Sequence, residues 1–388
     1  MIEQAQGWSR RQWLSISAGL GLAAGAGSGW AAPDAAANKA GAWPAWEGFC
    51  SRFVSDTGRV SANDKGQTYS EAQSYAMFFA LVANDRERFE ALTRWTENNL
   101  CAGDLTARLP AWLWGKREDG TWTVIDDNAA SDADLWIAYA LAEAGRLWKV
   151  PRYQALAATL AERIVREETA DLPQLGPMLL PGPKGFALPQ ERWRINPSYT
   201  PLQVLRLLET VTGQPVWRKL AQSAQRAMIE SAPRGFSPDW TVYDASQGFV
   251  PDTRPDKQGQ GGYNAIRVYL WAGMLHPQAW GREALLKALR PMALFVRDKG
   301  FPPESIDIAT GQHEGVAPVG FSAALLPFLQ ASGASDALRV QQLRLQAREP
   351  RADAYYEQCM VLFGQGFMEQ AYRFAADGRL LPRWGGRS

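Results

Sequence analysis

The stretch Ala130-Ser131-Asp132-Ala133-Asp134-Leu135-Trp136-Ile137-Ala138-Tyr139-Ala140-Leu141 combines an acidic start with a helical pattern. Its apolar residues continue as far as Trp148 and follow roughly the 3.6-residue period of an α-helix. Asp132 and Asp134 stand immediately before this apolar run. Ser131 and Asp132 are residue types that often cap helices, but two acids in one first turn exceed what capping requires. We therefore expect a helix whose first turn carries carboxylates for a further purpose.

Glu71 has the equivalent place in a second segment, residues 68–77, where it also precedes an apolar helical run. Thr68 and Glu71 have the spacing of a capping box, in which the glutamate side chain reaches back to the threonine N–H. The alternative is that Glu71 is a general acid. A helix N-terminus favours the ionised carboxylate, so that role requires partial burial or a like-charged neighbour such as Asp132 or Asp134. Acids at the starts of two helices, in a chain with 17 Trp, are typical of carbohydrate-cleaving carboxylate sites.

Helical patterns cover most of the chain from residue 41 onward, and they come in pairs. The first helices of successive pairs recur at intervals of about 60 residues, beginning near Glu71, Asp132, Tyr199, Asn264 and Phe321. This repeat predicts an all-α fold, an (α/α)6 barrel in which paired helices form a closed toroid. Because the inner helices run parallel, their N-termini are expected to meet around one cleft. Residues 38–388 are predicted to form this single domain, with one short strand at 122–125.

The composition excludes several classes of function. A net charge of +1 gives no support for nucleic-acid binding or for a basic membrane-binding surface. Two histidines and three widely spaced cysteines have no metal-ligand pattern, and no phosphate-binding glycine motif is present. We therefore expect no metal and no cofactor. Cys50 and Cys101 could form a disulfide in an oxidising compartment, and isolated buried thiols are the alternative.

The first 37 residues are predicted to be an export signal of the twin-arginine type. Arg10 and Arg11 precede an apolar, Gly- and Ala-rich run to about residue 26, and residues 35–37 offer a small-residue cleavage site. The run is too short and too weakly apolar for a good membrane span. A chance arginine pair ahead of a Sec-type signal would export the chain as well. The mature protein is thus expected to be periplasmic or secreted, with no membrane span.

Aromatic residues and hydrogen-bond donors near the acids are candidates for binding sugar rings. Trp and Tyr offer flat apolar faces to the C–H faces of sugars, although each ring taken alone could equally serve packing. Arginine and asparagine side chains from residues 194–199 and Arg267 could bind hydroxyl groups. The predicted substrate-binding residues are Tyr75, Trp112, Trp114, Asp134, Tyr199 and Arg267.

Segments 68–77 and 130–148 together resemble glycoside hydrolase family 8, whose signature reads Ala-Ser/Thr-Asp-Ala/Gly-Asp and ends in Trp. The resemblance covers nearly all of the mature chain. The chain is similar in particular to members from bacterial cellulose synthesis operons, at residues 110–116, 235–240, 265–269, 320–323 and 362–366. It implies an (α/α)6 barrel, an inverting mechanism and an open groove for β-1,4-glucan. It also implies that Glu71 is the proton donor and that Asp132 holds the sugar at the cleavage point.

Residue 264 departs from the family pattern. Many members have an aspartate, regarded as the general base, between the Tyr and Ala of a Tyr-x-Ala-Ile-Arg segment, and this chain has Asn264. An amide cannot accept a proton at neutral pH. Some members also carry Asn there and take the base from an inserted loop, but no inserted loop is evident here. The acids left for that role are Asp132, Asp244, Asp252 and Asp256.

The leading hypothesis is an exported endo-β-1,4-glucanase that trims cellulose or cello-oligosaccharides during cellulose production, with the cellulose synthase machinery as a candidate partner. A second hypothesis is a catalytically impaired glucan-binding protein that has lost its base at Asn264. Chitosanase or xylanase activity in the same fold is a third.

Overall fold

The computed structural model describes residues 43–252, 254 and 258–385, which belong to one compact unit, so the export signal predicted at 1–37 lies outside the described residues. The helices of this part of the chain lie close to their predicted positions. They are α2 (Pro44–Phe53), α3 (Ser70–Val82), α4 (Arg86–Leu100), α5 (Ser131–Trp148), α6 (Pro151–Glu168), α7 (Leu202–Thr212), α8 (Val216–Glu230), α9 (Ala265–Met274), α10 (Arg282–Lys299), α11 (Val319–Ala331), α12 (Ser335–Ala347) and α13 (Tyr355–Met368).

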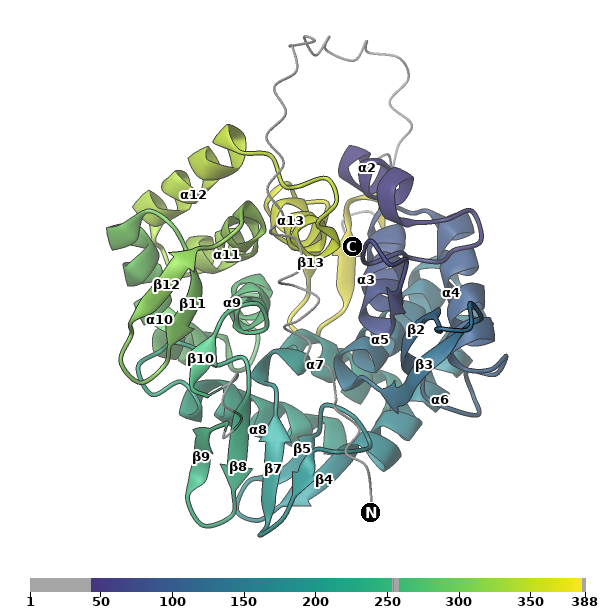
Figure 1. The fold of residues 1–388 in the computed structure, drawn as a ribbon, viewed down its shortest axis with the longest axis horizontal. Helices are drawn as coiled ribbons and strands as arrows, with labels where there is room; N and C mark the ends of the chain where they lie inside the picture. The colour runs from purple at the N-terminus through teal and green to yellow at the C-terminus, as the bar shows by residue number, and fades with distance from the viewer. Residues whose placement is uncertain (1–42, 253, 255–257, 386–388) are drawn as a thin grey trace. The chain divides into compact units, whose positions relative to one another are not determined.

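The helices form an inner and an outer ring (Figure 1). The inner ring consists of α3, α5, α7, α9, α11 and α13, each in contact with the next. Each inner helix is paired with an outer one, in the order α4, α6, α8, α10, α12 and α2. Inner helices such as α9 are buried on every side, whereas outer helices such as α8 bury only one face. This arrangement confirms the predicted (α/α)6 barrel.

Aromatic side chains close the ring between its last and first inner helices. Phe363 on α13 packs against Phe79 and Phe78 on α3, with ring centroids 4.6 and 5.4 Å apart. The edge-to-face geometry of the first pair is a favoured arrangement for aromatic rings. Residues far apart in sequence thereby join the two ends of the helical ring.

A C-terminal hairpin of β13 (Tyr372–Phe374) and β14 (Leu380–Pro382) packs on the inner helices from the end where α5 finishes. Tyr139 of α5 donates a hydrogen bond to the Gly378 carbonyl at 2.8 Å, and the Leu380 N–H donates to Glu143. Gly378 has φ +88°, and a Cβ there would lie 2.0 Å from the Gln203 carbonyl oxygen, so only glycine fits this close approach. The hairpin therefore closes the barrel at the end opposite to the helix N-termini.

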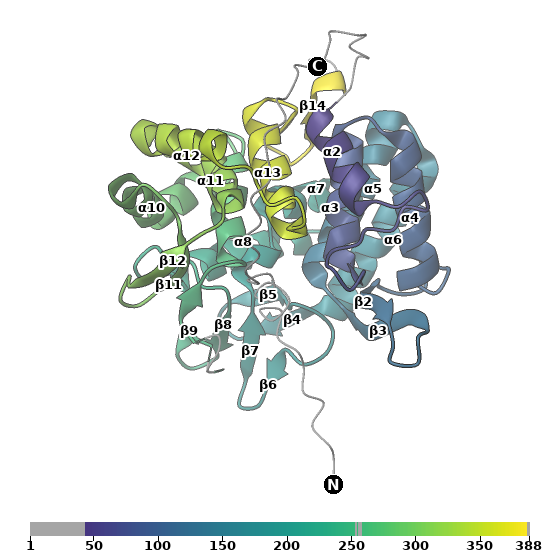
Figure 2. The same ribbon diagram turned by 45° about the horizontal axis from the view of Figure 1, so that its top comes forward.

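The structure contains more strands than the single one predicted at 122–125, which is part of β3. Besides β13 and β14, the strands of the described residues are β1 (Thr68–Tyr69), β2 (Ala111–Lys116), β3 (Trp122–Ala129), β4 (Thr169–Leu172), β5 (Gly176–Leu179), β6 (Ala187–Leu188), β7 (Arg192–Ile195), β8 (Thr241–Asp244), β9 (Gly248–Pro251), β10 (Gln260–Gly261), β11 (Pro303–Asp307) and β12 (His313–Val316). They lie in the loops that lead from an outer helix to the next inner helix, and Figure 2 shows β2, β3 and β6–β9 on one side of the ring. Such short strands have too little apolar alternation to be recognised in a sequence.

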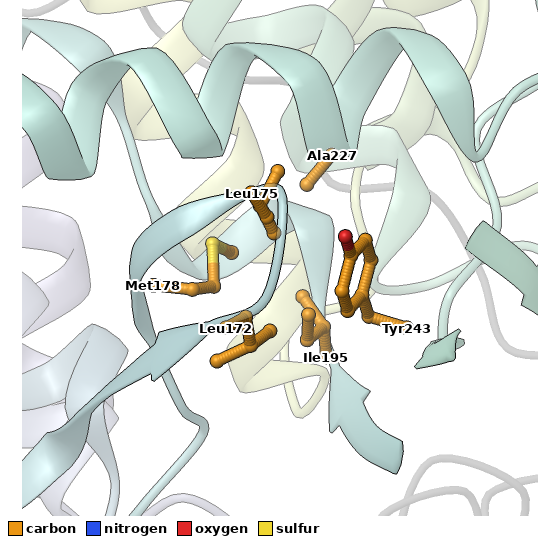
Figure 3. Close-up of a cluster of buried hydrophobic side chains, with 6 residues drawn as sticks. All are labelled: Leu172, Leu175, Met178, Ile195, Ala227 and Tyr243. Atoms are coloured by element: carbon orange, nitrogen blue, oxygen red, sulfur yellow. The ribbon is translucent and has the colours of Figure 1, made fainter. Parts of the chain in front are cut away.

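A small apolar cluster fixes one group of these loops on α8 (Figure 3). It consists of Leu172, Leu175, Met178, Ile195, Ala227 and Tyr243. Ser223 of α8 also donates a hydrogen bond to the Leu175 carbonyl at 3.0 Å. Because Ile195 is part of the cluster, the residues that follow it approach the N-termini of the inner helices from a fixed position.

Three other predictions can be compared with the described residues. Cys50, Cys101 and Cys359 are buried free thiols, so the alternative of isolated thiols holds and the Cys50–Cys101 disulfide does not. In residues 43–252, 254 and 258–385, no group of three or more His, Cys, Asp or Glu side chains could hold a metal ion. No helix in the same part of the chain is long and apolar enough to cross a membrane.

Candidate active site

Glu71 occupies the second position of α3, where its side chain is partly exposed. The capping box predicted as the alternative role is absent, because the N-cap residue of α3 is Tyr69 and Glu71 is not at the third helical position. The Thr68 hydroxyl instead donates a hydrogen bond to the Val60 carbonyl at 2.8 Å. The position of Glu71 is therefore not explained by local capping.

Asp132 occupies the same second position in α5 and is almost fully buried. Its Oδ1 accepts a hydrogen bond from the Ala133 N–H at 3.0 Å, and its Oδ2 lies 3.6 Å from Nη2 of Arg267 on α9. The helix N-terminus and the guanidinium both favour the ionised form of a carboxylate. These contacts hold the side chain in one orientation between two inner helices.

Arg267 is the cation that links the three inner helices. Burial disfavours its charge, but Tyr75, Tyr356 and the carboxylates of Asp132 and Glu71 act in the opposite direction, and the pKa of Arg267 is raised above its usual value. Its Nη2 also donates to the Ser198 hydroxyl at 2.8 Å. Glu71 and Asp132 occupy the same second position of the neighbouring inner helices α3 and α5, and Arg267 of α9 faces Asp132, so the structure brings these predicted residues to one end of the barrel.

Asn264 is the N-cap residue of α9 and is 9% exposed. Its Oδ1 accepts two hydrogen bonds, from Asn196 Nδ2 at 3.1 Å and from Arg267 Nη2 at 3.0 Å. Asn196 is held in turn, since its own Oδ1 accepts from the N–H and the hydroxyl of Ser198. The predicted base position thus faces donors only, an environment that would also suit a carboxylate.

Asp239 is a site residue that the sequence analysis missed. Its Oδ1 accepts hydrogen bonds from the N–H groups of Gly262, Asn264 and Ala265, at 2.8, 2.9 and 2.8 Å. It therefore caps α9 from a distant loop and fixes the direction of Asn264 and Arg267. A cap supplied from more than 20 residues upstream leaves no local sequence signal, and only the resemblance of residues 235–240 to the family included Asp239.

The predicted aromatic residues occupy different depths. Tyr75 is buried and packs edge-to-face on Phe363, 5.1 Å between ring centroids, so it forms the floor of the site. Tyr199 is also buried, with its ring 5.7 Å from the Arg267 guanidinium carbon. Tyr199 therefore supports Arg267, whereas the half-buried Trp112 and Trp114 lie on β2, the strand between β1 and β3.

Trp112 and Trp114 contact other aromatic rings around β2, the strand that follows α4 and pairs with β1. Trp112 lies 5.4 Å from Tyr69, and Trp114 stacks on Trp122 at 4.9 Å, measured between ring centroids. Thr68 is the register partner of Trp114 in the β1–β2 ladder. This pairing places β2 and its two tryptophans beside β1, whose last residue, Tyr69, stands two residues before Glu71.

Asp134 does not lie where a substrate-binding residue is expected. Its side chain is 0% exposed and lies beside the carboxyl group of Glu168 at the end of α6. The physical reason is the helical repeat: residues two apart point in different directions, so Asp132 and Asp134 cannot both face the cleft. The prediction of direct sugar contact by Asp134 is therefore corrected.

Two of the alternative acids for the base role, Asp244 and Asp252, are engaged in other contacts. Asp244 lies at the end of β8, where it accepts hydrogen bonds from Ser246 and Gln247 in an exposed turn. Asp252 is buried between Arg194 and Arg254, whose guanidinium groups lie 3.0 and 2.7 Å from it and lower its pKa despite its burial. Asp256 lies outside the described residues.

Comparison with known proteins agrees with this geometry. The family model for glycosyl hydrolases family 8 matches residues 30–370. An endoglucanase of Escherichia coli O157:H7 is 48% identical over 345 residues, which cover 88% of this chain and 92% of that protein. An endoglucanase of Xanthomonas axonopodis pv. citri is 47% identical over 359 residues, which cover 91% of this chain and 92% of that protein.

Solved structures give the same result. The endo-1,4-D-glucanase of Vibrio fischeri ES114 superposes with a TM-score of 0.83 at 42% sequence identity, covering 89% of this chain and 100% of that one. The residues matched by the family model include Glu71, Asp132 and Arg267, which lie on the inner helices α3, α5 and α9. The chain belongs to glycosyl hydrolase family 8 and is a glycoside hydrolase.

Proposed function

We propose that this protein is an endo-β-1,4-glucanase that hydrolyses internal bonds of cellulose with inversion at the anomeric carbon. The observation that carries the proposal is the convergence of Glu71, Asp132 and Arg267 at the N-terminal ends of three inner helices. The relatives from Escherichia coli and Xanthomonas are named endoglucanases, and the proposal extends that activity to this chain.

In this mechanism Glu71 donates a proton to the glycosidic oxygen as the bond breaks. Asp132, held by the Ala133 N–H and facing Arg267, orients the sugar and the attacking water. Arg267 carries a positive charge, is buried beside Asp132 and also acts on the partly exposed Glu71, so its electrostatic effect is strong. Inversion also needs a base roughly 6.5–9.5 Å from the acid, with space for a water molecule.

A second candidate function is glucan binding with impaired hydrolysis. It is favoured by one observation, the amide of Asn264 at the expected base position, with its oxygen engaged by Asn196 and Arg267. Neither donor changes the fact that an amide is a very poor proton acceptor. This candidate predicts tight binding of cello-oligosaccharides and slow release of reducing ends.

The deciding experiment measures reducing-end release from carboxymethylcellulose by the purified protein, with Glu71→Gln as the inactive reference. Hydrolysis well above that of the reference supports an endoglucanase, whereas binding of cellopentaose without such release supports the second candidate. Chitosan and xylan, assayed in parallel, test the third hypothesis. The anomeric configuration of the first product, followed by NMR, tests inversion.

We also propose that the protein acts outside the cytoplasm, on glucan chains that the same cell produces. The support is the twin-arginine pattern at Arg10 and Arg11 together with the nature of the substrate, a polymer too large to enter the cell. Replacing both arginines by lysine should retain the protein in the cytoplasm. Co-purification with the cellulose synthase machinery tests the proposed partnership.

A further inference from the structure

Two buried carboxyl groups meet beside Asp132. Asp134 comes from the first turn of α5 and is 0% exposed, and Glu168 is the last residue of α6 and is 1% exposed. None of their four carboxyl oxygens receives a hydrogen bond from an N–H or hydroxyl group of the described residues. Because α5 and α6 form an antiparallel pair joined by only two residues, the start of α5 lies beside the end of α6, and the two carboxyl groups act directly on each other. Two ionised carboxylates are both acceptors, so a hydrogen bond between them requires a proton on one of them.

The surroundings of the pair are acidic. The ionisable groups that act on Asp134 come from each neighbouring element: Asp132 on α5, Glu71 on α3, Glu167 on α6 and Cys101 after α4. Glu167 is itself paired with Arg163 and Arg166 at 2.5 and 2.6 Å. Burial, supported by these acids, raises the pKa of both Asp134 and Glu168 well above the usual carboxyl range.

The helix directions determine which residue holds the proton. Asp134 lies at the N-terminal end of α5, where the helix dipole stabilises a negative charge. Glu168 lies at the C-terminal end of α6, where the dipole opposes one. The neutral acid is therefore Glu168, which donates to the Asp134 carboxylate.

We propose that Asp134 and Glu168 share one proton at neutral pH and act as positioning residues, fixing the first turn of α5 and with it the carboxylate of Asp132. Loss of that proton would leave two negative charges in a buried site and would push the first turn of α5 from its place. The positioning role rests on the proposed function of Asp132 in glucan hydrolysis. The shared proton itself does not depend on any activity.

The proton is tested by infrared spectroscopy of the full-length protein at pH 7. The difference spectrum between the wild type and Glu168→Gln should show the C=O band of one protonated carboxyl group. Glu167→Gln, a change of the same type at the neighbouring ion-paired residue, is the matched control and should leave that band in place. A band that is absent from the wild type, or unchanged in Glu168→Gln, overturns the proposal.

Stability and activity give independent readouts. Glutamine retains an N–H donor to Asp134, so the Glu168→Gln variant should fold. As the pH rises above the usual glutamate pKa, the melting temperature of this variant should decrease less than that of the wild type. The sign follows from the raised pKa, because the folded wild type holds a proton that the unfolded chain releases. Equal pH slopes for the two proteins contradict the shared proton.

Glu168→Ala removes the donor and should lower kcat for carboxymethylcellulose by about 10²-fold, the scale of a misplaced catalytic group, with KM little changed. Glu168→Gln, which keeps a donor, should retain most of the wild-type kcat. If the two variants lose activity equally while the infrared band behaves as expected, the proton is present but the positioning role is wrong. If the wild type itself is inactive, the proposed function fails and the infrared and stability results still stand.

Discussion

Arg267 and Asn264 lie one turn apart on α9, and Nη2 of Arg267 donates a hydrogen bond to Oδ1 of Asn264 at 3.0 Å. The same guanidinium nitrogen lies 3.6 Å from Asp132. One cation thus connects the expected base position to the carboxylate of α5. Because Asn196 is also a donor to Asn264, a carboxylate at residue 264 would keep both hydrogen bonds.

Asn264→Asp should therefore raise the rate of glucan hydrolysis, by about 10²-fold if the wild type lacks a base altogether. The new carboxylate would be kept ionised by the N-terminus of α9 and by Arg267. Reducing-end release from carboxymethylcellulose is the measurement. Asn98→Asp, which adds the same charge to an exposed position of α4, is the control. A lower rate in Asn264→Asp would mean that another acid is the base.

Glu71→Gln should abolish hydrolysis, with a loss of about 10²–10⁴-fold, because glutamine cannot protonate the leaving oxygen. Binding of cellopentaose, followed by calorimetry, should remain. Glu87→Gln changes the same residue type at the same second position of an exposed outer helix, α4, and should be without effect. A loss of stability with an unchanged rate per folded molecule would show that Glu71 is structural.

Asp132→Asn should lower the rate to a similar extent and also weaken binding at the cleavage point, since the amide loses its attraction to Arg267. Asp336→Asn is the matched control, because Ser335 and Asp336 begin α12 as Ser131 and Asp132 begin α5, but on the surface. A lower melting temperature combined with normal turnover would reduce Asp132 to a helix-capping role.

Asp239→Ala should destabilise the protein by roughly 2 kcal/mol, because it removes the acceptor of hydrogen bonds from three N–H groups at the start of α9. The rate should fall as well, since Asn264 and Arg267 depend on that cap. Asp244→Ala also removes an acceptor of three hydrogen bonds, but in an exposed turn, and should have a smaller effect. Unfolding in urea provides the free energies. Equal losses for the two variants would argue against a special role for Asp239.

The sequence predicted the helices well because their apolar residues recur over ten or more positions. Inner helices such as α5 carry a further signal, since acids precede an almost wholly apolar run. The other short strands between helices were missed because two to six residues give little periodicity. The strand predicted at 122–125 is part of β3, which has eight residues and pairs with β2 in a hairpin that joins Lys116 to Trp122.

Side-chain direction was the harder part of the site to predict. The sequence identified Asp132 and Asp134 as a pair, but their different surroundings depend on how α5 is rotated against α3 and α6. Asp239 was missed for a related reason, because the residue that it caps is distant in the chain. Spacing along a helix can therefore suggest candidate acids, whereas packing decides which of them faces the cleft.

The closing contacts of the barrel have a consequence for how the protein is made. Trp384 donates hydrogen bonds to the carbonyls of Leu81 and Val82, across about 300 residues of sequence. Trp46, near the start of the described chain, donates a hydrogen bond to Asp85, which lies only a few residues after Leu81 and Val82. A ribosome therefore releases almost the entire domain before this segment can receive its last partner. Until then the chain is a series of helix pairs without a finished centre, and the domain completes its fold only after its last residues have been made.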